Sequence, residues 1–251
     1  MQNTGIALVT GATSGLGAEY CRQLASQCKT IIAVGRRGDH LQALRAELDG
    51  LTRIHPVVAD LSTVEGVTRT VEALRQQGPV DLLINNAGFS TLGDFADSTL
   101  ELELQIVRLQ IDAPLELARA ALPFMREQGR GQIINVASVG AFVELQKTAV
   151  YGACKAFLLA FSRSLQAEVA GQGIRVQCLC PGLTRTEIHD TPHFAGFDKG
   201  RFPESMWMEA DAVVAESLAA LAGDEVVVIP GQINRDIVRG GLQQQLQALP
   251  H

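Results

Sequence analysis

Three side chains with complementary chemistry lie in one short stretch of this chain, between Ser138 and Lys155. Tyr151 follows Ser138 by thirteen residues, and Lys155 follows Tyr151 by four. Residues four apart share one face of a helix, so the spacing predicts that the phenol and the ammonium point the same way. A hydroxyl, a phenol and an ammonium that converge on one point would form a site for proton transfer.

The phenol of such a site needs a lowered pKa. The reference pKa of tyrosine is about 10, which is too high for efficient proton exchange in both directions near neutral pH. A lysine ammonium about 5 Å away, at an effective dielectric constant of about 20, favours the phenolate by ~3 kcal/mol, or about two pKa units. We therefore expect Lys155 to lower the pKa of Tyr151, and Ser138 to orient and polarise a substrate carbonyl.

The elements that must position these residues alternate between short apolar runs and longer helical patterns. Strands are predicted at residues 6–10, 30–34, 54–59, 82–85, 132–137, 175–179 and 226–229. Helices are predicted at residues 15–27, 39–48, 63–77, 98–128, 149–170 and 209–222. Near-continuous apolar strands separated by helices indicate a parallel sheet covered on both faces, with right-handed crossovers. We predict an α/β fold: a doubly wound parallel sheet of about seven strands in three layers.

The chain of 251 residues is long enough for one such domain and shows no internal repeat or linker, so we predict a single domain over residues 1–251. Residues 184–208 break the alternation, because they are rich in aromatic residues, prolines and glycines. Long segments of this kind often form lids, and we predict a substrate lid there. The tail after Pro230 ends in LQQQLQAL, a candidate amphipathic helix that could pack on the body or on a second subunit.

Composition argues against several classes of partner. The net charge is -6 and the basic residues are scattered, which disfavours a nucleic-acid or anionic membrane surface. No apolar run approaches the ~20 residues of a membrane span, and the N-terminus reads as a first strand and not as a signal peptide. The five cysteines form no metal-ligand pattern and suit a reducing compartment. We therefore expect a cytoplasmic protein without a metal site.

A glycine-rich turn follows the first predicted strand. The stretch TGATSGLG places Gly11, Gly15 and Gly17 between that strand and the first helix. Glycine permits a tight turn and close approach of the backbone to a ligand, and a helix N-terminus offers unpaired N–H groups to a phosphate. Glycines also serve ordinary turns, but the position between strand and helix predicts a cradle for the pyrophosphate of a dinucleotide.

Two arginines follow the second predicted strand, in GRRGD. An NAD-preferring site usually has an acid near this point, whereas arginine suits the 2′-phosphate of NADP. The alternative is that Arg36 and Arg37 are solvated surface cations. Positive charge at the start of a helix is unfavourable for the helix dipole, so this alternative is the less favoured one. A hydrogen bond to a charged group contributes ~1.5–3 kcal/mol, which predicts a roughly 10- to 100-fold preference for NADP(H) over NAD(H).

These motifs, in this order, resemble the short-chain dehydrogenase/reductase family in its compact single-domain type. The resemblance covers nearly the whole chain and includes TGATSGLG, Asp60 after the third strand, NNAG at residues 85–88, Ser138, the Tyr151–Lys155 pair and PGLTRT at residues 181–186. It implies a Rossmann-like fold, ketoreductase chemistry on C=O or CH–OH groups, and a homodimer or homotetramer formed through the long helices at 102–125 and 149–170.

The resemblance also implies which residues contact the cofactor. Ser14 with Arg36 or Arg37 would meet the 2′-phosphate, and Lys155 would bond the nicotinamide ribose. The implied set is Gly11, Thr13, Ser14, Gly15, Leu16 and Gly17 in the turn, Arg36 and Arg37, Asp60 and Leu61 beside the adenine, Asn86, Ala87 and Gly88 along the cofactor, and Tyr151, Lys155, Pro181, Gly182, Thr184 and Thr186 at the nicotinamide end.

One position departs from the family pattern. The family usually has an asparagine in the long fourth helix, which contributes to a proton relay through a water near the lysine. Gln110, in RLQIDAP, stands at that place. Glutamine keeps the amide but is longer by one methylene, so we expect the geometry of the relay to differ more than the hydride step. The alternative is that Gln110 only packs within the helix.

The expected substrate pocket is mostly apolar. It is built from Phe89, the lid and the residues after Ser138, namely Val139, Gly140, Ala141, Phe142, Val143, Glu144 and Leu145. This composition predicts an apolar ketone or secondary alcohol, although an anionic tail could meet Arg185, His189, Lys199 or Arg201. The sequence thus predicts an NADP(H)-dependent carbonyl reductase or alcohol dehydrogenase. The alternatives are a catalytically silent NADP(H)-binding regulator and, less compatible with the chain length, a lyase or epimerase.

Overall fold

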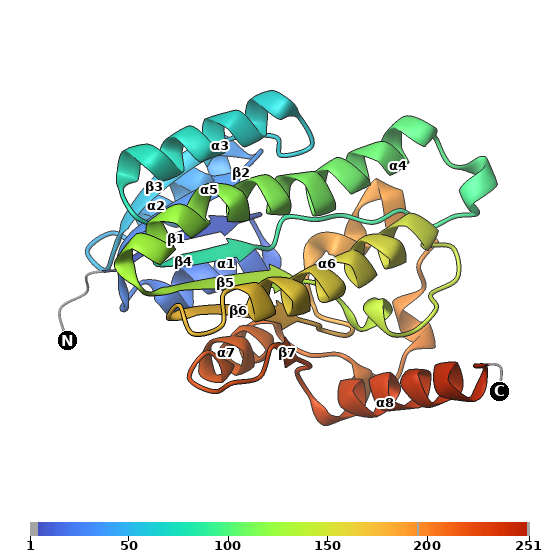
Figure 1. Ribbon diagram of the computed structural model, residues 1–251. Helices are drawn as coiled ribbons and strands as arrows, with labels where there is room; N and C mark the ends of the chain where they lie inside the picture. Colours follow the sequence, from blue (N-terminus) through green and yellow to red (C-terminus); the bar gives the residue numbers. More distant parts are fainter. Residues whose placement is uncertain (1–4, 195, 250–251) are drawn as a thin grey trace.

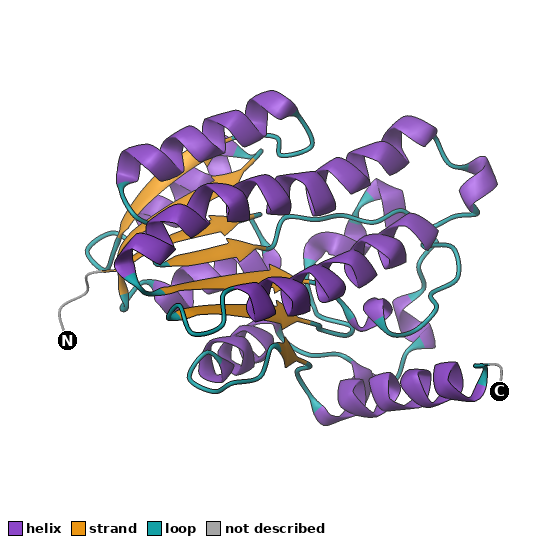
Figure 2. Cartoon of the chain, viewed as in Figure 1, coloured by secondary structure: helices purple, strands orange, loops and turns teal. Residues whose placement is uncertain are grey.

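The computed structural model describes residues 5–194 and 196–249. Residues 1–4, 250 and 251 of the predicted domain and residue 195 of the predicted lid lie outside the described residues. Within them, seven parallel strands form one sheet in the order β3-β2-β1-β4-β5-β6-β7 (Figures 1 and 2). The strands are β1 (Gly5–Thr10), β2 (Cys28–Gly35), β3 (Arg53–Val58), β4 (Leu82–Asn85), β5 (Gly131–Val136), β6 (Ile174–Leu179) and β7 (Val227–Val228). The predicted doubly wound sheet is confirmed.

Helices cover both faces of the sheet (Figure 1). On one face lie α1 (Gly15–Leu24), α2 (Gly38–Glu47) and α7 (Ala210–Ala220), whose buried residues Tyr20, Leu41 and Val213 share one core with the strands. On the other face lie α3 (Val64–Gln77), α4 (Leu100–Val107), α5 (Ala113–Gln128) and α6 (Ala149–Glu168). Leu74 and Leu117 belong to the core on that side. The result is the predicted three-layer arrangement.

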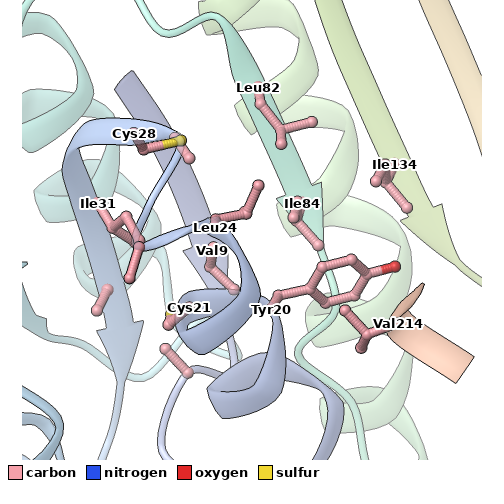
Figure 3. Close-up of a cluster of buried hydrophobic side chains, with 14 of the residues drawn as sticks. Val9, Tyr20, Cys21, Leu24, Cys28, Ile31, Leu82, Ile84, Ile134 and Val214 are labelled. Carbon is pink, nitrogen blue, oxygen red and sulfur yellow. The ribbon is translucent and has the colours of Figure 1, made fainter. Parts of the chain in front are cut away.

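The apolar runs of the sequence are explained by this double cover. Successive strand residues point to opposite faces, so Val9 of β1 enters the first core and Leu8 enters the second. Figure 3 shows the first core, where Tyr20 of α1 lies near Ile84 of β4 and Val214 of α7. Both faces of the strands are buried, and hydrophobic residues therefore occur without alternation.

Two helical regions differ from the prediction by more than a few residues. The predicted helix 98–128 is divided into α4, a π-helical segment (Arg108–Asp112) and α5. Pro114 has no N–H to donate to the carbonyl four residues earlier, and its ring opposes a regular α-turn there, so the turn before it widens. The tail forms a sixteen-residue helix, α8 (Gln232–Gln247), longer than the expected short one. Its Val238 is buried in a core cluster with Phe142, so the tail packs on the body.

The candidate residues gather at the carboxyl ends of the strands. Strand β1 runs into Gly11, β4 into Asn86, β5 into Ser138 after one residue, and β6 into Pro181 after one residue. Because the strands are parallel, these four ends lie at one edge of the sheet. Strand β1 pairs with both β2 and β4, so the order reverses beside it. Ligands of open α/β sheets bind in the crevice at such a switch point.

Candidate active site

A cavity of about 1090 Å³ lies at this edge, between the strand ends, the segment 184–208 and the start of α8. It brings together residues that are up to about 175 positions apart in the sequence and that sequence reasoning had assigned to one site. Those that line it are Gly11, Thr13, Ser14, Gly15, Leu16, Arg36, Arg37, Asp60, Leu61, Asn86, Ala87, Gly88, Gln110, Ser138, Tyr151, Lys155, Pro181, Gly182, Thr184 and Thr186.

One wall of the cavity consists of Ser138, Tyr151 and Lys155, which we call the α6 wall. Ser138 follows β5 and caps a short 3-10 helix, where its Oγ accepts a hydrogen bond from the Gly140 N–H at 3.1 Å. Tyr151 and Lys155 lie in the first turns of α6, and the Lys155 Nζ is 5.3 Å from the centre of the Tyr151 ring. The Nζ also donates to the Val136 carbonyl at 2.9 Å.

The electrostatics of the α6 wall differ from the expectation that Lys155 would lower the pKa of Tyr151. Burial raises the pKa of Tyr151, because it disfavours the phenolate, and a hydrogen bond with Ser138 offsets part of this effect. Burial also lowers the pKa of Lys155 to about 8, since its side chain is only 5% exposed. The expected lowering was wrong because it counted the attraction between the two charges but not the cost of removing each from water.

The amide of Gln110 lies in the π-helical segment and is buried. Its Nε2 donates to the Phe89 carbonyl oxygen at 2.9 Å. Because a carbonyl oxygen can only accept a hydrogen bond, this contact fixes which end of the amide is the nitrogen. The Oε1 atom has no hydrogen-bond partner among the described residues. A Cβ on Gly88 would lie 3.0 Å from this oxygen, so glycine leaves room there. A buried acceptor without a donor is unfavourable, so this oxygen is a position where a bound donor would be stabilising.

The glycine-rich turn is held by tight backbone contacts. Gly11 has φ of +69° and Gly15 has φ of +52°, the left-handed region that suits glycine. Gly17 does not line the cavity; a Cβ there would lie 2.1 Å from the Gly11 carbonyl oxygen, so its absence lets α1 start close behind the turn. The side chain of Asn86 donates to the Thr10 carbonyl at 2.9 Å and ties β4 to the turn.

The start of α1 fits a phosphate. Its N-cap, Ser14, makes no side-chain capping bond within the described part of the chain, and the first N–H groups of a helix lack partners inside it. The residues present therefore offer backbone donors and close approach, the two features that a pyrophosphate needs. Asp60, in the loop after β3, has a structural contact in addition to its place on the cavity wall. Its carboxylate accepts hydrogen bonds from the backbone N–H and the hydroxyl of Ser62, which orders the loop beside Leu61.

Arg36, Arg37 and Thr13 form the opposite end of the cavity, which we call the arginine edge. Arg37 donates through Nη2 to the carbonyl and the hydroxyl oxygen of Thr13, both at 3.2 Å. The same Nη2 is 2.9 Å from a carboxylate oxygen of Glu187. Arg36 is exposed and makes no hydrogen bond or ion pair with any residue that the structure describes. Its guanidinium is open to a ligand.

Comparison with known proteins agrees with this geometry. The sequence model of the short chain dehydrogenase family matches residues 5–193. The chain belongs to the short-chain dehydrogenase/reductase family. An uncharacterized oxidoreductase of Myxococcus xanthus is 34% identical over 231 residues, which cover 90% of this chain and 88% of that protein. The recognition made from the sequence motifs is thereby confirmed, and with it an oxidoreductase fold that binds a nicotinamide cofactor.

Solved structures of the family are similar over nearly the whole chain. A short-chain dehydrogenase from Sphingobium yanoikuyae, solved in complex with NADPH, is 33% identical, has a TM-score of 0.85 and covers 99% of this chain and 97% of its own. A bulky-bulky ketone specific alcohol dehydrogenase from Comamonas testosteroni is 27% identical, with a TM-score of 0.81 and coverage of 100% and 96%.

The segment predicted to be a lid in this short-chain dehydrogenase, residues 184–208, is held together at its two ends. The Met208 N–H donates to the Leu183 carbonyl, and the Arg185 N–H donates to the Met208 carbonyl, both at 2.9 Å. Inside the segment, aromatic rings pack around His189, whose ring centre lies 4.9 Å from that of Phe197 and 5.3 Å from that of Trp207. The His189 Nδ1 is buried without a partner among the described residues. These contacts give the segment a half-buried aromatic cluster of its own.

The expected substrate pocket needs several corrections. Gly140, Ala141 and Phe142 do not line the cavity, because the chain turns inward after Val139 and Phe142 packs under α8. Two cations assigned to the pocket face elsewhere. Lys199 pairs with Asp190 at 2.5 Å, and Arg185 pairs with Glu204 and lies over the Trp207 ring. The residues that do line the cavity as expected are Phe89, Val139, Val143, Glu144, Leu145, His189 and Arg201.

Sequence reasoning missed the contribution of α8 to this short-chain dehydrogenase. Asn234 and Ile237 line the cavity, and Asn234 is 3% exposed, with its amide bonded to the Pro230 carbonyl at 2.8 Å. A Cβ on Gly182 would lie 2.0 Å from Asn234, so the loop after β6 and the start of α8 interlock. The sequence did contain a signal for the longer helix, because apolar residues at 233, 237 and 238 have helical spacing and precede the tail motif.

Proposed function

We propose that this short-chain dehydrogenase is an NADP(H)-dependent oxidoreductase that acts on ketones and secondary alcohols. One observation carries the proposal: the α6 wall, the glycine-rich turn and the arginine edge all line the same cavity. The bound nicotinamide supplies or accepts the hydride. The residues of the chain then have to bind the cofactor, orient the carbonyl and move one proton. We propose that one domain does this, with residues 184–208 as its lid.

The proton chemistry falls to the α6 wall. Tyr151, whose pKa is raised by burial, holds its proton at neutral pH, so its hydroxyl is ready to protonate the substrate oxygen during reduction. Ser138 shares a hydrogen bond with that phenol and would hold the same oxygen in place. Lys155, with a pKa of about 8, is mostly protonated at pH 7 and would stabilise the phenolate as it forms. Oxidation would use the same groups in reverse.

Preference for NADP(H) is supported by the arginine edge. Arg36 is without a partner among the described residues, and both arginines line the cavity. Asp39, the acid nearest to this edge in sequence, is exposed and is not among the residues that line the cavity. The similar Sphingobium yanoikuyae enzyme is solved with NADPH. A guanidinium forms bidentate bonds with a phosphate, which a ribose hydroxyl cannot match.

An apolar carbonyl substrate is supported by the lining beside the α6 wall. Val143 and Leu145 face the cavity from one side, and Phe194 and Phe197 of the lid face it from the other. Such walls favour a substrate with a sizeable apolar group next to the carbonyl. The similar Comamonas testosteroni enzyme is described as specific for bulky-bulky ketones, which makes ketones with two large substituents the first class to try.

The proposal is tested by incubating the protein with NADPH and a panel of aryl and alicyclic ketones while absorbance at 340 nm is followed. We expect turnover with at least one ketone, and a fall of about 10²–10⁴-fold in kcat for Tyr151→Phe, the range of general acid–base contributions. NADPH binding by the variant, measured by calorimetry, should stay unchanged. Binding of NADPH without oxidation across the whole panel would instead support the rival reading, a silent NADP(H)-binding regulator.

We further propose that Gln110 takes part in the proton relay. Its buried Oε1 lacks a donor among the described residues, and Gln110 and Lys155 line the same cavity, so a water held between them would give that oxygen its donor. Gln110→Ala should reduce kcat and displace its pH profile, whereas Gln110→Asn should restore part of the loss. An unchanged pH profile in Gln110→Ala would remove the residue from the relay.

A homodimer or homotetramer and a cytoplasmic location remain parts of the proposal. Leu100 and Leu104 are exposed apolar residues of α4, the short first part of the region predicted as one long helix, and they would lie near the proposed subunit contact. All five cysteines are free and buried, as suits a reducing compartment. Among the described residues, no helix combines the length and the apolarity needed to cross a membrane. Light scattering at several protein concentrations determines the oligomeric state.

A further inference from the structure

A carboxylate of the lid occupies the guanidinium that we assign to the cofactor phosphate. The Oε2 atom of Glu187 lies 2.9 Å from Nη2 of Arg37. Both residues line the cavity, and they come from different sides of it, Arg37 from the end of β2 and Glu187 from the lid. The ion pair therefore joins the lid to the arginine edge. Its side chains are 40% and 57% exposed, so it is weak enough to be exchanged.

Two anions cannot share Arg37 without cost. The Nη2 group donates to the carbonyl and the hydroxyl oxygen of Thr13 and also forms the ion pair with Glu187. A phosphate monoester carries about −1.5 to −2 charges at neutral pH and would lie next to the Glu187 carboxylate. The negative charges of the phosphate and the carboxylate would repel each other. Arg36, in contrast, has no partner to give up among the described residues and can take a phosphate directly.

We propose that Glu187 competes with the 2′-phosphate for Arg37, so that Glu187 sets the affinity for NADP(H) and couples the identity of the cofactor to the position of the lid. The inference rests on the proposed use of NADP(H). A cofactor with a 2′-phosphate displaces Glu187 and frees the lid from the arginine edge. A cofactor with a 2′-hydroxyl leaves the ion pair in place and the lid tied down.

A movement of Glu187 can be transmitted to the aromatic cluster of the lid through one short helix. Glu187 is the first residue of a 3-10 helix, Glu187–Asp190, that also carries His189. The His189 ring packs edge-on against Trp207 at 5.3 Å. Trp207 is the one tryptophan in the sequence, so the intrinsic fluorescence of the protein reports on the lid. A change at Arg37 can thus be observed without any catalysis.

The test uses two small probes, adenosine 2′,5′-bisphosphate and adenosine 5′-monophosphate, which differ in the 2′-phosphate. Affinity is measured by calorimetry and lid movement by Trp207 fluorescence. With the wild-type chain, we expect the bisphosphate to bind more tightly and to change the fluorescence, and the monophosphate to leave it unchanged. Glu187→Gln should bind the bisphosphate about two- to fivefold more tightly, the range that exposed ion pairs contribute, with no gain for the monophosphate.

Two further variants isolate the ion pair. Asp190→Asn removes one negative charge from the same short helix, but Asp190 pairs with Lys199 and does not line the cavity; it should bind both probes as the wild type does. In an Arg37→Ala background, Glu187→Gln should no longer tighten the bisphosphate, because the contested guanidinium is gone. This double-mutant cycle distinguishes competition for Arg37 from a general effect of charge.

The failures of the two proposals are distinguishable. If the bisphosphate binds more tightly than the monophosphate but Glu187→Gln changes neither its affinity nor the fluorescence response, competition at Arg37 is overturned and NADP(H) preference stands. If Asp190→Asn tightens the bisphosphate as much as Glu187→Gln does, the effect is general charge and the inference fails. If both probes bind equally well, the proposed preference for NADP(H) fails, and the competition fails with it.

Discussion

The α6 wall and the proposed lid, residues 184–208, line one cavity but are built in opposite ways. Lys155 is buried at the start of a twenty-residue helix and is bonded to a strand carbonyl, and Ser138 is 8% exposed at the end of β5. The lid carries its groups on short 3-10 helices, and its ion pairs, such as Arg37–Glu187, are partly exposed. The groups proposed for proton transfer thus sit on rigid elements, and the groups proposed for recognition sit on a loop.

This difference separates the kinds of effect that substitutions should have. On the α6 wall, burial makes the charge of Lys155 costly, so a change there alters chemistry and stability together. On the lid, contacts are screened by water or confined to a separate aromatic cluster, so a change there should alter binding with little effect on the core. Enzymes commonly combine a rigid scaffold with loops that carry binding residues. Substitutions at single residues test whether this protein does so.

The largest effect is expected from Lys155→Met, because it removes a charge from the α6 wall. We expect kcat to fall by about 10²–10⁴-fold. The pKa of this amine is lowered from 10.5 to about 8 in the folded protein. Its removal should therefore stabilise the fold by up to about 3 kcal/mol, less about 1 kcal/mol for the hydrogen bond lost at Val136. Activity is measured by initial rates and stability by urea unfolding.

The sign of the pH dependence follows from the same pKa. Between about pH 8 and pH 10.5, the unfolded chain keeps a proton on Lys155 that the folded protein has lost, so the contribution of this residue to stability rises with pH. That rise should be absent in Lys155→Met and present in Lys29→Met, a control at an exposed lysine of β2. A variant that loses both activity and stability would show that Lys155 holds the wall together, and would contradict the predicted gain in stability.

At the arginine edge, Arg37→Ala should weaken NADPH binding by roughly 10- to 100-fold, because one charge-assisted hydrogen bond to the phosphate is lost. NADH binding should be nearly unchanged, since NADH offers no phosphate to this guanidinium. Calorimetry with both cofactors measures the ratio. Arg75→Ala, which removes an exposed cation from α3, is the matched control. Equal weakening of both cofactors would mean that Arg37 supports the turn through Thr13 and does not read the phosphate.

The phenol of Tyr151 offers a spectroscopic test of the α6 wall. The chain has two tyrosines, and burial raises the pKa of both Tyr20 and Tyr151. Without cofactor, absorbance at 295 nm should show no phenolate below about pH 10. With NADP⁺ present, the positive charge of the nicotinamide should lower the pKa of Tyr151, and Tyr151→Phe should abolish that step.

The titration of Tyr151 also fixes the direction of the pH–rate profiles. Ketone reduction needs the protonated phenol, so its rate should fall as pH rises through this pKa. Alcohol oxidation needs the phenolate, so its rate should increase over the same range. If NADP⁺ leaves the 295 nm titration unchanged, cofactor charge does not reach the phenol, and another group must control the proton.

The smallest effect is expected from Phe197→Ala in the lid. Its ring packs against His189 and lies 5.4 Å from that of Phe202, between centres. We expect KM for a bulky ketone to rise about three- to tenfold, as for a lost apolar contact worth ~1 kcal/mol, with kcat nearly constant. Urea unfolding should be close to that of Phe95→Ala, a control at an exposed phenylalanine outside the lid. A large loss of global stability would show that the lid belongs to the core.

Much of the fold was predictable because periodicity and turn residues are local. The strand runs and the spacing from Tyr151 to Lys155 follow from the identity of neighbouring residues alone, and the positions of Gly11 and Gly15 reflect a backbone conformation that few other residues adopt. The bounds of the long helix were less accurate, because the effect of Pro114 on the preceding turn depends on how the chain accommodates the ring.

The sequence by itself determined the family, the three-layer sheet and the set of residues that share one edge of it, because short-range pattern and strand order suffice for these. Tertiary structure alone decided what surrounds each group. It buries Lys155 and half-buries Tyr151, and desolvation moves the pKa of each group toward its neutral form. It leaves the Gln110 oxygen without a donor among the described residues, and it places Glu187 on Arg37 across 150 residues of chain. Burial and charge contacts depend on distances between remote segments, which no local pattern encodes.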